Sequence, residues 1–395
     1  MLYIEIMDDK KLIFHKGVYK KSATTAEAVF IITGMTIGAG ILGLPYVVAQ
    51  VGLLAGLIYI ICLGLVMLCL NLMIGEIAVR TKRNFQLPGF AGKYLGPWAK
   101  GVLSVTIVLS GFGTLLAYII GEGQALAALL GGNPMWWSIF FWSVGSLVVW
   151  RGLQTIKRVE RVLSLVVMSI IVGLSIYMLP YMVPMNFYLP DISRFFLPFG
   201  VILFALHASP AIAEVHALLP GNQSKFKKAV IIGTLIPIFI YVLFALAVVG
   251  VSGGMTTEVA TVGLGEIFGP GVLIVGNLFA VLAMGAAFMG MGMALKQTFV
   301  WDHKLPKWVA DYFVIAIPLL LFLIGFRNFI TVLSMVGGIF IGIEAIFMVL
   351  IFWKAKRYGD VDANRYGSGH FWFLVLPVFA VFTFAMVFSI VNLLI

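Results

Sequence analysis

Charged side chains are scarce in this sequence. Asp, Glu, Lys and Arg make up 11% of the 395 residues, against roughly 25% in soluble globular proteins. Hydrophobic residues make up 62%, and the mean hydropathy is +1.09. This composition excludes an ordinary soluble enzyme. At about 20 apolar residues per crossing, it is typical of a polytopic membrane protein with short loops.

Cysteine and the common catalytic motifs are also nearly absent. Cys62 and Cys69 lie seven residues apart in one apolar run, on the same helix face, where they cannot pair. No nucleotide-binding loop, zincin motif, nucleophile elbow or pair of catalytic carboxylates occurs in the chain. We therefore expect no enzymatic activity, no metal and no cofactor.

Apolar runs of spanning length follow a mixed-polarity N-terminal segment, residues 1–23, which lacks the features of a signal peptide. We expect this segment to be a cytoplasmic tail and residues 24–395 to form a single domain. The sequence predicts an all-α membrane protein with eleven transmembrane helices, at residues 24–50, 53–79, 100–129, 134–150, 160–181, 195–216, 229–251, 270–295, 308–325, 328–353 and 371–394.

The net charge of +10 is explained by membrane topology rather than by nucleic-acid binding, because the basic residues are spread through the turns between apolar runs instead of forming one patch. In the eleven-span map, 24 of the 26 Lys and Arg residues lie in the tail and in alternate loops, which leaves Arg194 and Arg327 on the other side. The positive-inside rule then predicts a multi-pass plasma-membrane protein with a cytoplasmic N-terminus and an extracytoplasmic C-terminus.

Two of the predicted spans are interrupted at mid-membrane. Four glycines and Pro45 lie within residues 34–45 of the first span, and a polar cluster with Pro210 lies within residues 204–210 of the sixth. These spans begin two units of five helices, residues 24–181 and 195–353, with an additional span at 371–394. Because five is odd, the units would have inverted topology, and inverted repeats with broken leading helices are typical of secondary transporters.

The break in the first span is a candidate anion site. At Gly38-Ala39-Gly40-Ile41, glycines permit close backbone approach and positive φ. The half-helix that follows would direct free N–H groups at a carboxylate. An alternative interpretation is close helix packing through Gly34 and Gly38, four residues apart.

Ionisable residues at membrane depth are candidates for ion coupling. His207 lies in the sixth-span break, where it could carry a proton or simply hydrogen-bond a carbonyl freed by the break. Glu122 lies one turn after Tyr118 in the third span, as a coupling acid or as a satisfied structural carboxylate. Glu76 precedes Arg80 by four residues, which predicts a structural ion pair.

The segments 34–45, 118–123 and 204–210 resemble the amino acid/auxin permease family, and most closely its prokaryotic aromatic and hydroxy amino-acid permeases. The resemblance implies a leucine-transporter-type fold in which the first break holds the substrate carboxylate, the sixth-span break receives the amino group and Tyr118 closes the pocket. The candidate substrate-binding residues are Thr36, Gly38, Ala39, Gly40, Ile41, Tyr118, Phe204, Leu206, His207, Ser209 and Phe288, and the candidate ion-coupling residues are Glu122 and His207.

The sequence departs from both coupling patterns known in the wider fold. Residues 278–295 of the eighth span contain no Ser, Thr, Asn, Asp or Glu, so a sodium site would lack oxygen ligands from there. The lysine that some proton-coupled relatives carry midway along the fifth span is also missing. We expect a proton to be the coupled ion; sodium coupling, exchange-type transport and an amino-acid sensor are the alternatives.

The expected substrate is a neutral amino acid, possibly with a hydrophobic or aromatic side chain. Residues 36–44 and 204–210 contain no carboxylate for a cationic side chain and no arginine for a second carboxylate. The expected partners are this amino acid, a co-transported proton and membrane lipid, and no nucleic acid.

Overall fold

The computed structural model describes residues 12–15, 18–21, 23–151, 156–186, 194–219, 221–302, 304–363, 366 and 372–394. Most of the predicted tail lies outside these ranges. The described part of the tail is an antiparallel hairpin of β1 (Leu12–His15) and β2 (Val18–Lys21), with Leu12 opposite Lys21. This hairpin was not predicted from the sequence.

The other elements are helical, and each predicted apolar run coincides with a helix or with helices in succession. In chain order they are α1 (Thr25–Thr36), α2 (Gly40–Val51), α3 (Leu53–Val79), α4 (Leu87–Tyr94), α5 (Pro97–Leu130), α6 (Pro134–Arg151), α7 (Ile156–Met178), η1 (Leu179–Tyr181), η2 (Pro184–Asn186), α8 (Pro198–Ala205), α9 (Ser209–Leu218), α10 (Gln223–Ser252), η4 (Gly253–Met255), α11 (Ala260–Phe268), α12 (Pro270–Gln297), η5 (Thr298–Asp302), α13 (Lys307–Leu323), α14 (Phe329–Met335), η6 (Val336–Ile341), α15 (Gly342–Tyr358) and α16 (Trp372–Leu394).

Local sequence explains where several helices begin. Thr24 and Glu27 form a reciprocal capping box at α1, each side chain accepting a hydrogen bond from the other residue's backbone N–H. Asn222 caps α10 by accepting from the backbone N–H of Lys225. This cap extends the helix beyond the apolar run, so α10 begins before the predicted start at residue 229.

Within the described residues, six helical segments are long and apolar enough to cross a membrane, and α1 with α2 forms a seventh that is bent by 58° at its break. Shorter apolar helical segments occur at Leu165–Tyr181 and Val375–Val391. The outer surface of the bundle exposes large apolar side chains such as Ile58, Phe239 and Leu376, as expected where lipid covers a protein. The chain is therefore a multi-pass membrane protein.

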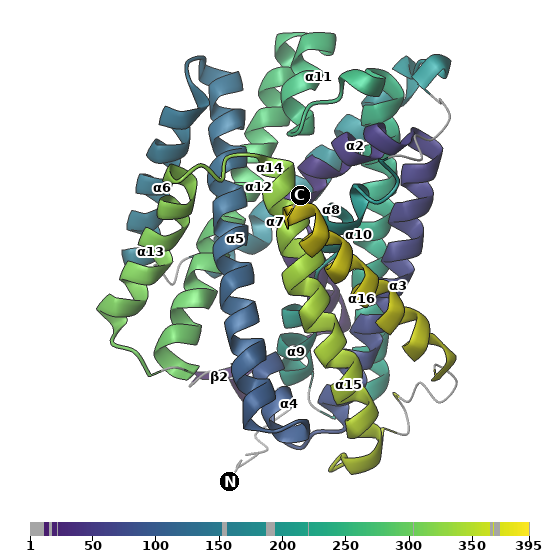
Figure 1. Cartoon of the computed structure of the whole chain (residues 1–395), viewed down its shortest axis with the longest axis vertical. Coiled ribbons are helices and arrows are strands. Elements are labelled where there is room, and N and C mark those ends of the chain that lie inside the picture. Colours follow the sequence, from purple (N-terminus) through teal and green to yellow (C-terminus); the bar gives the residue numbers. More distant parts are fainter. Residues whose placement is uncertain are drawn as a thin grey trace.

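The interrupted helices lie inside the bundle (Figure 1). α2 packs against α8 and α10, and α8 also packs against α14 and the π-helical turn η6. The long helix α5 packs along α12, and α3 packs along α10. Strand β2 and helix α4 lie toward one end of the bundle, and α11 lies at the other (Figure 1).

Candidate substrate and coupling site

The first interruption separates α1 from α2. α1 ends at Thr36, the next three residues are not helical, and α2 begins at Gly40. Ala39 and Ile41 are fully buried. A Cβ atom on Gly38 would lie 3.3 Å from the hydroxyl oxygen of Tyr118, so the structure brings α5 beside the break, where the sequence analysis expected Tyr118 to lie.

Neither Gly38 nor Gly40 uses the positive φ that glycine permits. The residues with positive φ include Gly52 and Gly131 but neither Gly38 nor Gly40. Gly40 is required for another reason, since a Cβ atom there would lie 2.5 Å from the Cα atom of Ala205. Close packing thus explains Gly40 at the contact between α2 and α8, although the packing interpretation from the sequence had named Gly34 and Gly38 instead. This contact does not exclude ligand binding by the adjacent backbone.

The second interruption separates α8 from α9. α8 ends at Ala205 and α9 begins at Ser209, with Pro210 in its first turn, where a residue without a backbone N–H is tolerated. Leu206 is buried and Phe204 is partly buried. The hydroxyl of Ser209 is buried and has no hydrogen-bond partner among the described residues, although buried polar groups are usually paired.

Tyr241 of α10 joins the two interruptions. Its buried hydroxyl lies 2.9 Å from the carbonyl oxygen of Thr36 and 3.0 Å from that of Ala205, and it donates toward both. These carbonyls belong to the ends of α1 and α8, where the helical hydrogen-bond ladder stops. The sequence analysis missed Tyr241 because nothing in the α10 sequence distinguishes it from other aromatic residues in apolar runs.

His207 lies between α8 and α9 and meets an acid from α15. Its Nε2 atom is 2.9 Å from Oε1 of Glu344, and the side chains are 18% and 4% exposed. Glu344 follows the π-helical turn η6, which packs against α8; such turns often occur at functional sites. Of the two interpretations of His207, the hydrogen bond to a carbonyl freed by the break is not the contact that its Nε2 atom makes, because the partner of this atom is a carboxylate.

Glu122 of α5 is fully buried, and neither carboxylate oxygen has a hydrogen-bond partner among the described residues. A Cβ atom on Gly285 would lie 3.4 Å from its Oε1 atom, which places the carboxylate against α12. The interpretation of Glu122 as a satisfied structural carboxylate therefore has no support from hydrogen bonding. An ionised carboxylate in this position would be costly, because no hydrogen-bond donor among the described residues compensates for its lost hydration.

Two other candidate residues make contacts that packing explains. The Thr36 hydroxyl donates to the Ile32 carbonyl at 2.7 Å, within its own helix. The ring of Phe288 stacks edge to face on Phe141 at 5.1 Å, and a Cβ atom on Gly145 would lie 2.7 Å from it. Phe288 thus contacts α6, and its place in a substrate pocket stays a prediction.

The profile of the tryptophan/tyrosine permease family matches residues 21–389. The chain belongs to the tryptophan/tyrosine permease family. The resemblance to prokaryotic aromatic amino-acid permeases is thereby confirmed, and the family is one of transporters rather than enzymes.

Two curated relatives and one solved structure resemble this permease over most of its length. Glutamine transporter 2 of Aliivibrio fischeri is 27% identical over 357 residues, which cover 85% of this chain and 90% of the relative. Tyrosine-specific transport system 1 of Haemophilus influenzae is 23% identical over 394 residues, which cover 93% and 97%. MhsT, solved in complex with L-phenylalanine, matches with a TM-score of 0.65 at 15% identity, covering 94% of this chain and 98% of MhsT. At that identity the likeness shows the fold alone, and it is the leucine-transporter type.

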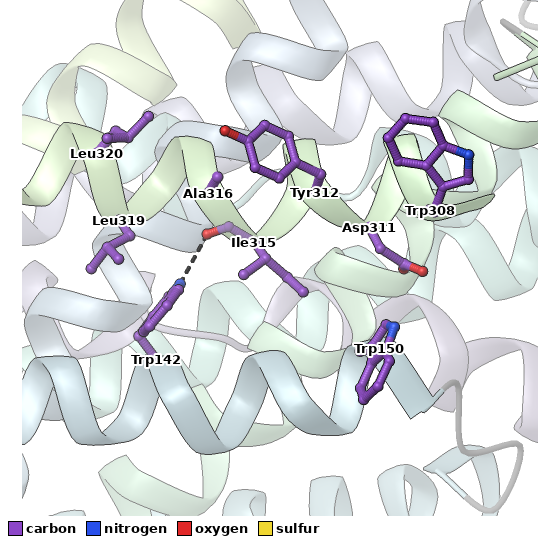
Figure 2. A pocket seen from close by; sticks show the side chains of 9 residues that line it. All are labelled: Trp142, Trp150, Trp308, Asp311, Tyr312, Ile315, Ala316, Leu319 and Leu320. Atoms are coloured by element: carbon purple, nitrogen blue, oxygen red, sulfur yellow. Dashed lines mark hydrogen bonds between the residues drawn. The ribbon is translucent and has the colours of Figure 1, made fainter. Parts of the chain in front are cut away.

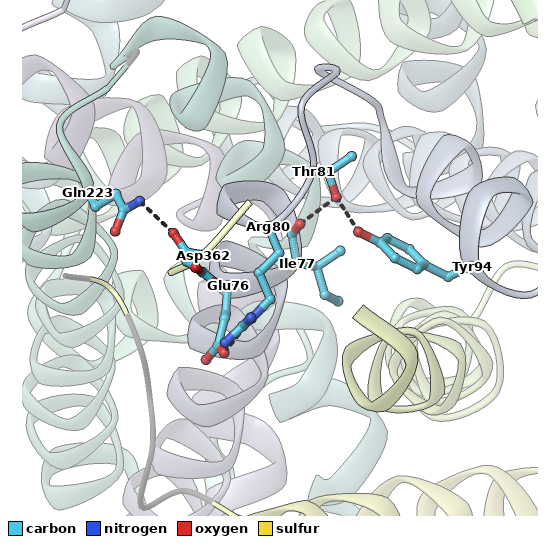
Figure 3. A network of polar contacts seen from close by, with 7 residues as sticks. All are labelled: Glu76, Ile77, Arg80, Thr81, Tyr94, Gln223 and Asp362. Carbon is cyan, nitrogen blue, oxygen red and sulfur yellow. Dashed lines mark hydrogen bonds and ion pairs between the residues drawn. The ribbon is translucent and has the colours of Figure 1, made fainter. Parts of the chain in front are cut away.

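At the α4 end of the permease, polar contacts connect α3, α4, α10 and the segment after α15 (Figure 3). The predicted Glu76–Arg80 ion pair is confirmed, with Nε 2.8 Å from Oε1. Thr81 donates to the Ile77 carbonyl at 2.7 Å, so the contact of 2.8 Å with Tyr94 has the tyrosine as donor.

The segment after α15 is tied to the same end by Asp360. Its carboxylate accepts from the backbone N–H of Lys82 at 3.1 Å and forms an ion pair with Lys93. Its own backbone N–H donates to the Arg80 carbonyl at 2.8 Å. The hydrogen bond from Lys93 is the main reason that the pKa of Asp360 lies below its ordinary value. Among the described residues, no three His, Cys, Asp or Glu side chains gather as a metal site.

Proposed function

We propose that this permease is a secondary active transporter of neutral amino acids that works by alternating access, with its substrate bound where α1, α2 and α8 meet. The observation that carries the proposal is the Tyr241 hydroxyl, 2.9 and 3.0 Å from the last carbonyls of α1 and α8. Beside it, the first turn of α2 has backbone N–H groups without helical partners. These N–H groups suit a carboxylate, and the carbonyl ends of α1 and α8 suit an ammonium group.

The candidate pocket residues are those on both sides of the two breaks. Gly38, Ala39, Gly40 and Ile41 would receive the carboxylate, while Thr36 and the segment 204–209 would receive the amino group and the side chain. The unpaired Ser209 hydroxyl is a further donor for a polar ligand. A neutral substrate is supported by the absence of Arg, Asp and Glu from both break segments. Relatives are named for glutamine and tyrosine, both of which have uncharged side chains.

The architecture belongs to the same proposal. Eleven crossings, with residues 24–181 and 195–353 as inverted repeats, would place the N-terminus in the cytoplasm and the C-terminus outside. Support comes from helices at all eleven predicted positions and from interruptions in the leading helix of each unit. Rocking of one unit against the other would then expose the site alternately to each side.

The coupled ion would be a proton carried by Glu122 or by the His207–Glu344 pair. Buried Glu122 has no hydrogen-bond partner in the part of the chain that the structure describes, so it is more stable protonated than ionised. Its protonation would therefore favour the conformation described here. Protonation of His207 would strengthen its contact with Glu344 and fix the α8–α9 break against α15. Sodium has weaker support, because residues 278–295 of α12 offer no side-chain oxygen.

Counterflow in proteoliposomes tests the transport function. Vesicles loaded with unlabelled amino acid should accumulate labelled tyrosine, phenylalanine or glutamine when the purified permease is present, because only a carrier exchanges substrate across the membrane. Amides of the same amino acids should not compete, since they lack the carboxylate. Thermal stabilisation by an amino acid without any exchange would instead identify a sensor and refute the transport proposal.

Variants of each acid test the coupling. If Glu122 or Glu344 carries the proton, its replacement in Glu122→Gln or Glu344→Gln should abolish proton-driven accumulation of substrate. Counterflow should be retained in that variant, because exchange needs substrate binding and alternating access but no net proton movement. Glu266→Gln, on the exposed surface of α11, is the matched control and should behave like the unchanged permease. Strict dependence on sodium, with choline unable to replace it, would contradict proton coupling while leaving the transporter proposal intact.

A further inference from the structure

A groove of about 590 Å³ lies between α6 and α13, away from the interrupted helices. Figure 2 shows Trp150, Asp311 and Trp308 at one end of it and Trp142, Leu319 and Leu320 at the other. α6 and α13 both pack inward, against α5 and α12. The groove is therefore a feature of the bundle's periphery, separate from the candidate substrate site.

The groove opens outward onto the membrane-facing surface. Trp308 is 74% exposed, Trp150 is 58% exposed and Leu320 is 53% exposed. Such large apolar side chains are normally covered, and in a membrane protein the default cover is lipid. From Trp308 to Leu320, α13 rises about 18 Å, at about 1.5 Å per residue. This length approximates one leaflet of a hydrocarbon core about 30 Å thick, so it fits one acyl chain.

The polar end of the groove has a distinct charge pattern. Asp311 forms an ion pair with Lys296, whose Nζ atom also lies 3.4 Å from the Trp150 carbonyl. Among the described residues that line the groove, the one acid is thus neutralised by a cation. Arg151 follows Trp150 directly, and Lys304 and Lys307 precede Trp308; all three of these basic residues are exposed. This end has an excess of positive charge beside interfacial tryptophans.

The other end is held by a hydrogen bond between the helices. The indole N–H of Trp142 donates to the Ile315 carbonyl at 2.9 Å (Figure 2). This bond ties α6 to α13 at the end of the groove away from Trp150 and Trp308. The groove thus has a fixed apolar floor and a cationic mouth, which is the arrangement that an amphiphile with an anionic head requires.

We propose that the groove binds an anionic phospholipid from the leaflet on the α4 side of the bundle. One acyl chain would lie along α13 from Trp308 toward Leu320, and the phosphate would lie near Arg151, Lys304 and Lys307. The proposal does not depend on which amino acid is transported or on which ion is coupled.

Thermal unfolding of the delipidated permease in detergent tests this site. The probes are phosphatidylglycerol, phosphatidylcholine with the same acyl chains, and inorganic phosphate. Phosphatidylglycerol should stabilise the protein at lower concentration than phosphatidylcholine, and inorganic phosphate should have no effect. Equal stabilisation by both lipids, or by phosphate alone, would overturn the proposal.

Two kinds of variant locate the effect. Arg151→Gln combined with Lys307→Gln should weaken the response to phosphatidylglycerol about 30-fold, since two cations are removed at the membrane surface. Ala316→Phe, which fills the groove, should remove the lipid preference without changing the cations. The control pair is Lys100→Gln and Trp98→Ala, exposed residues near the start of α5, and neither should alter the response.

Two outcomes of the variant experiments would overturn the proposal. One is a preference for phosphatidylglycerol that persists in Ala316→Phe, because the occupied groove could no longer admit a chain. The other is loss of a dimer in Ala316→Phe, measured by light scattering, which would assign the groove to a second copy of this chain.

Discussion

Gly40→Ala tests the contact that brings the two interrupted helices together. The added methyl group would lie 2.5 Å from the Cα atom and 2.6 Å from the Cβ atom of Ala205. Carbon atoms in good contact lie about 3.5 to 4.0 Å apart. The neighbour on one side is backbone, which cannot rotate away, so α2 and α8 must separate by about 1 Å to accept the methyl group.

The expected cost follows from this overlap. Overpacking a close contact costs about 1 to 3 kcal/mol, and at the first position of α2 the helix-propensity gain of alanine, at most about 1 kcal/mol, offsets only part of it. Separation by about 1 Å would also stretch the hydrogen bonds of Tyr241 beyond about 3.5 Å for at least one carbonyl. We expect a net destabilisation of about 1 to 2 kcal/mol, or about 5- to 30-fold in the unfolding equilibrium.

Equilibrium unfolding in mixed micelles of mild detergent and dodecyl sulfate measures this change. The matched control is Gly101→Ala, since a Cβ atom there meets nothing within 4 Å and its site is inside α5, where alanine should be neutral or stabilising. Gly40→Ala should also weaken stabilisation by substrate amino acids. If Gly40→Ala unfolds at the same dodecyl sulfate fraction as Gly101→Ala, the close approach of α2 to α8 is not what the permease requires at this position.

Three further predictions concern single contacts. Tyr241→Phe should destabilise the permease by about 1 to 2 kcal/mol in the same unfolding assay, because two buried carbonyls lose their donor. Tyr366→Phe should be nearly neutral, since that buried hydroxyl has no partner among the described residues; equal effects would contradict the role given to Tyr241. The pKa of Asp360 is lower in the folded protein than its ordinary value. The contribution of its ionised carboxylate to folding stability is therefore fully present above the unfolded pKa of about 3.9, and it is lost as pH falls through the lower folded pKa. The stability difference between the unchanged permease and Asp360→Asn, measured against pH, should therefore shrink below about pH 4, and a constant difference would refute this assignment. In a background without Cys62 and Cys69, Lys225→Cys should resist an impermeant thiol reagent added outside intact cells and Gly254→Cys should react, because they lie at opposite ends of α10; equal labelling would contradict the proposed orientation.

Apolar composition and run length were enough to predict the helices. The apolar runs coincide with helices because about 20 apolar residues without charge bury their backbone polar groups in lipid only as a helix. Elements outside the runs were missed. α4 (Leu87–Tyr94), α11 (Ala260–Phe268) and the tail hairpin are short, and they depend on contacts with the bundle rather than on a run of their own.

The interruptions were also predictable, since glycine and proline disfavour helix for local reasons. The sequence therefore determined that the first and sixth apolar runs break near Gly38 and His207. The family resemblance was visible in the same segments.

Only the tertiary structure decided what each broken end contacts. His207 and Glu344 are 137 residues apart in the chain, and Tyr241 contacts Thr36 across 205 residues. A single sequence contains no information on which faces of distant helices meet, because any of several apolar faces would bury similar area. The requirement for glycine at position 40 arises from such a meeting: it reflects the nearby backbone of Ala205 rather than the φ angle of Gly40 itself. The sequence thus determined where the helices form and where two of them break, and packing determined which polar groups meet in the interior of the bundle.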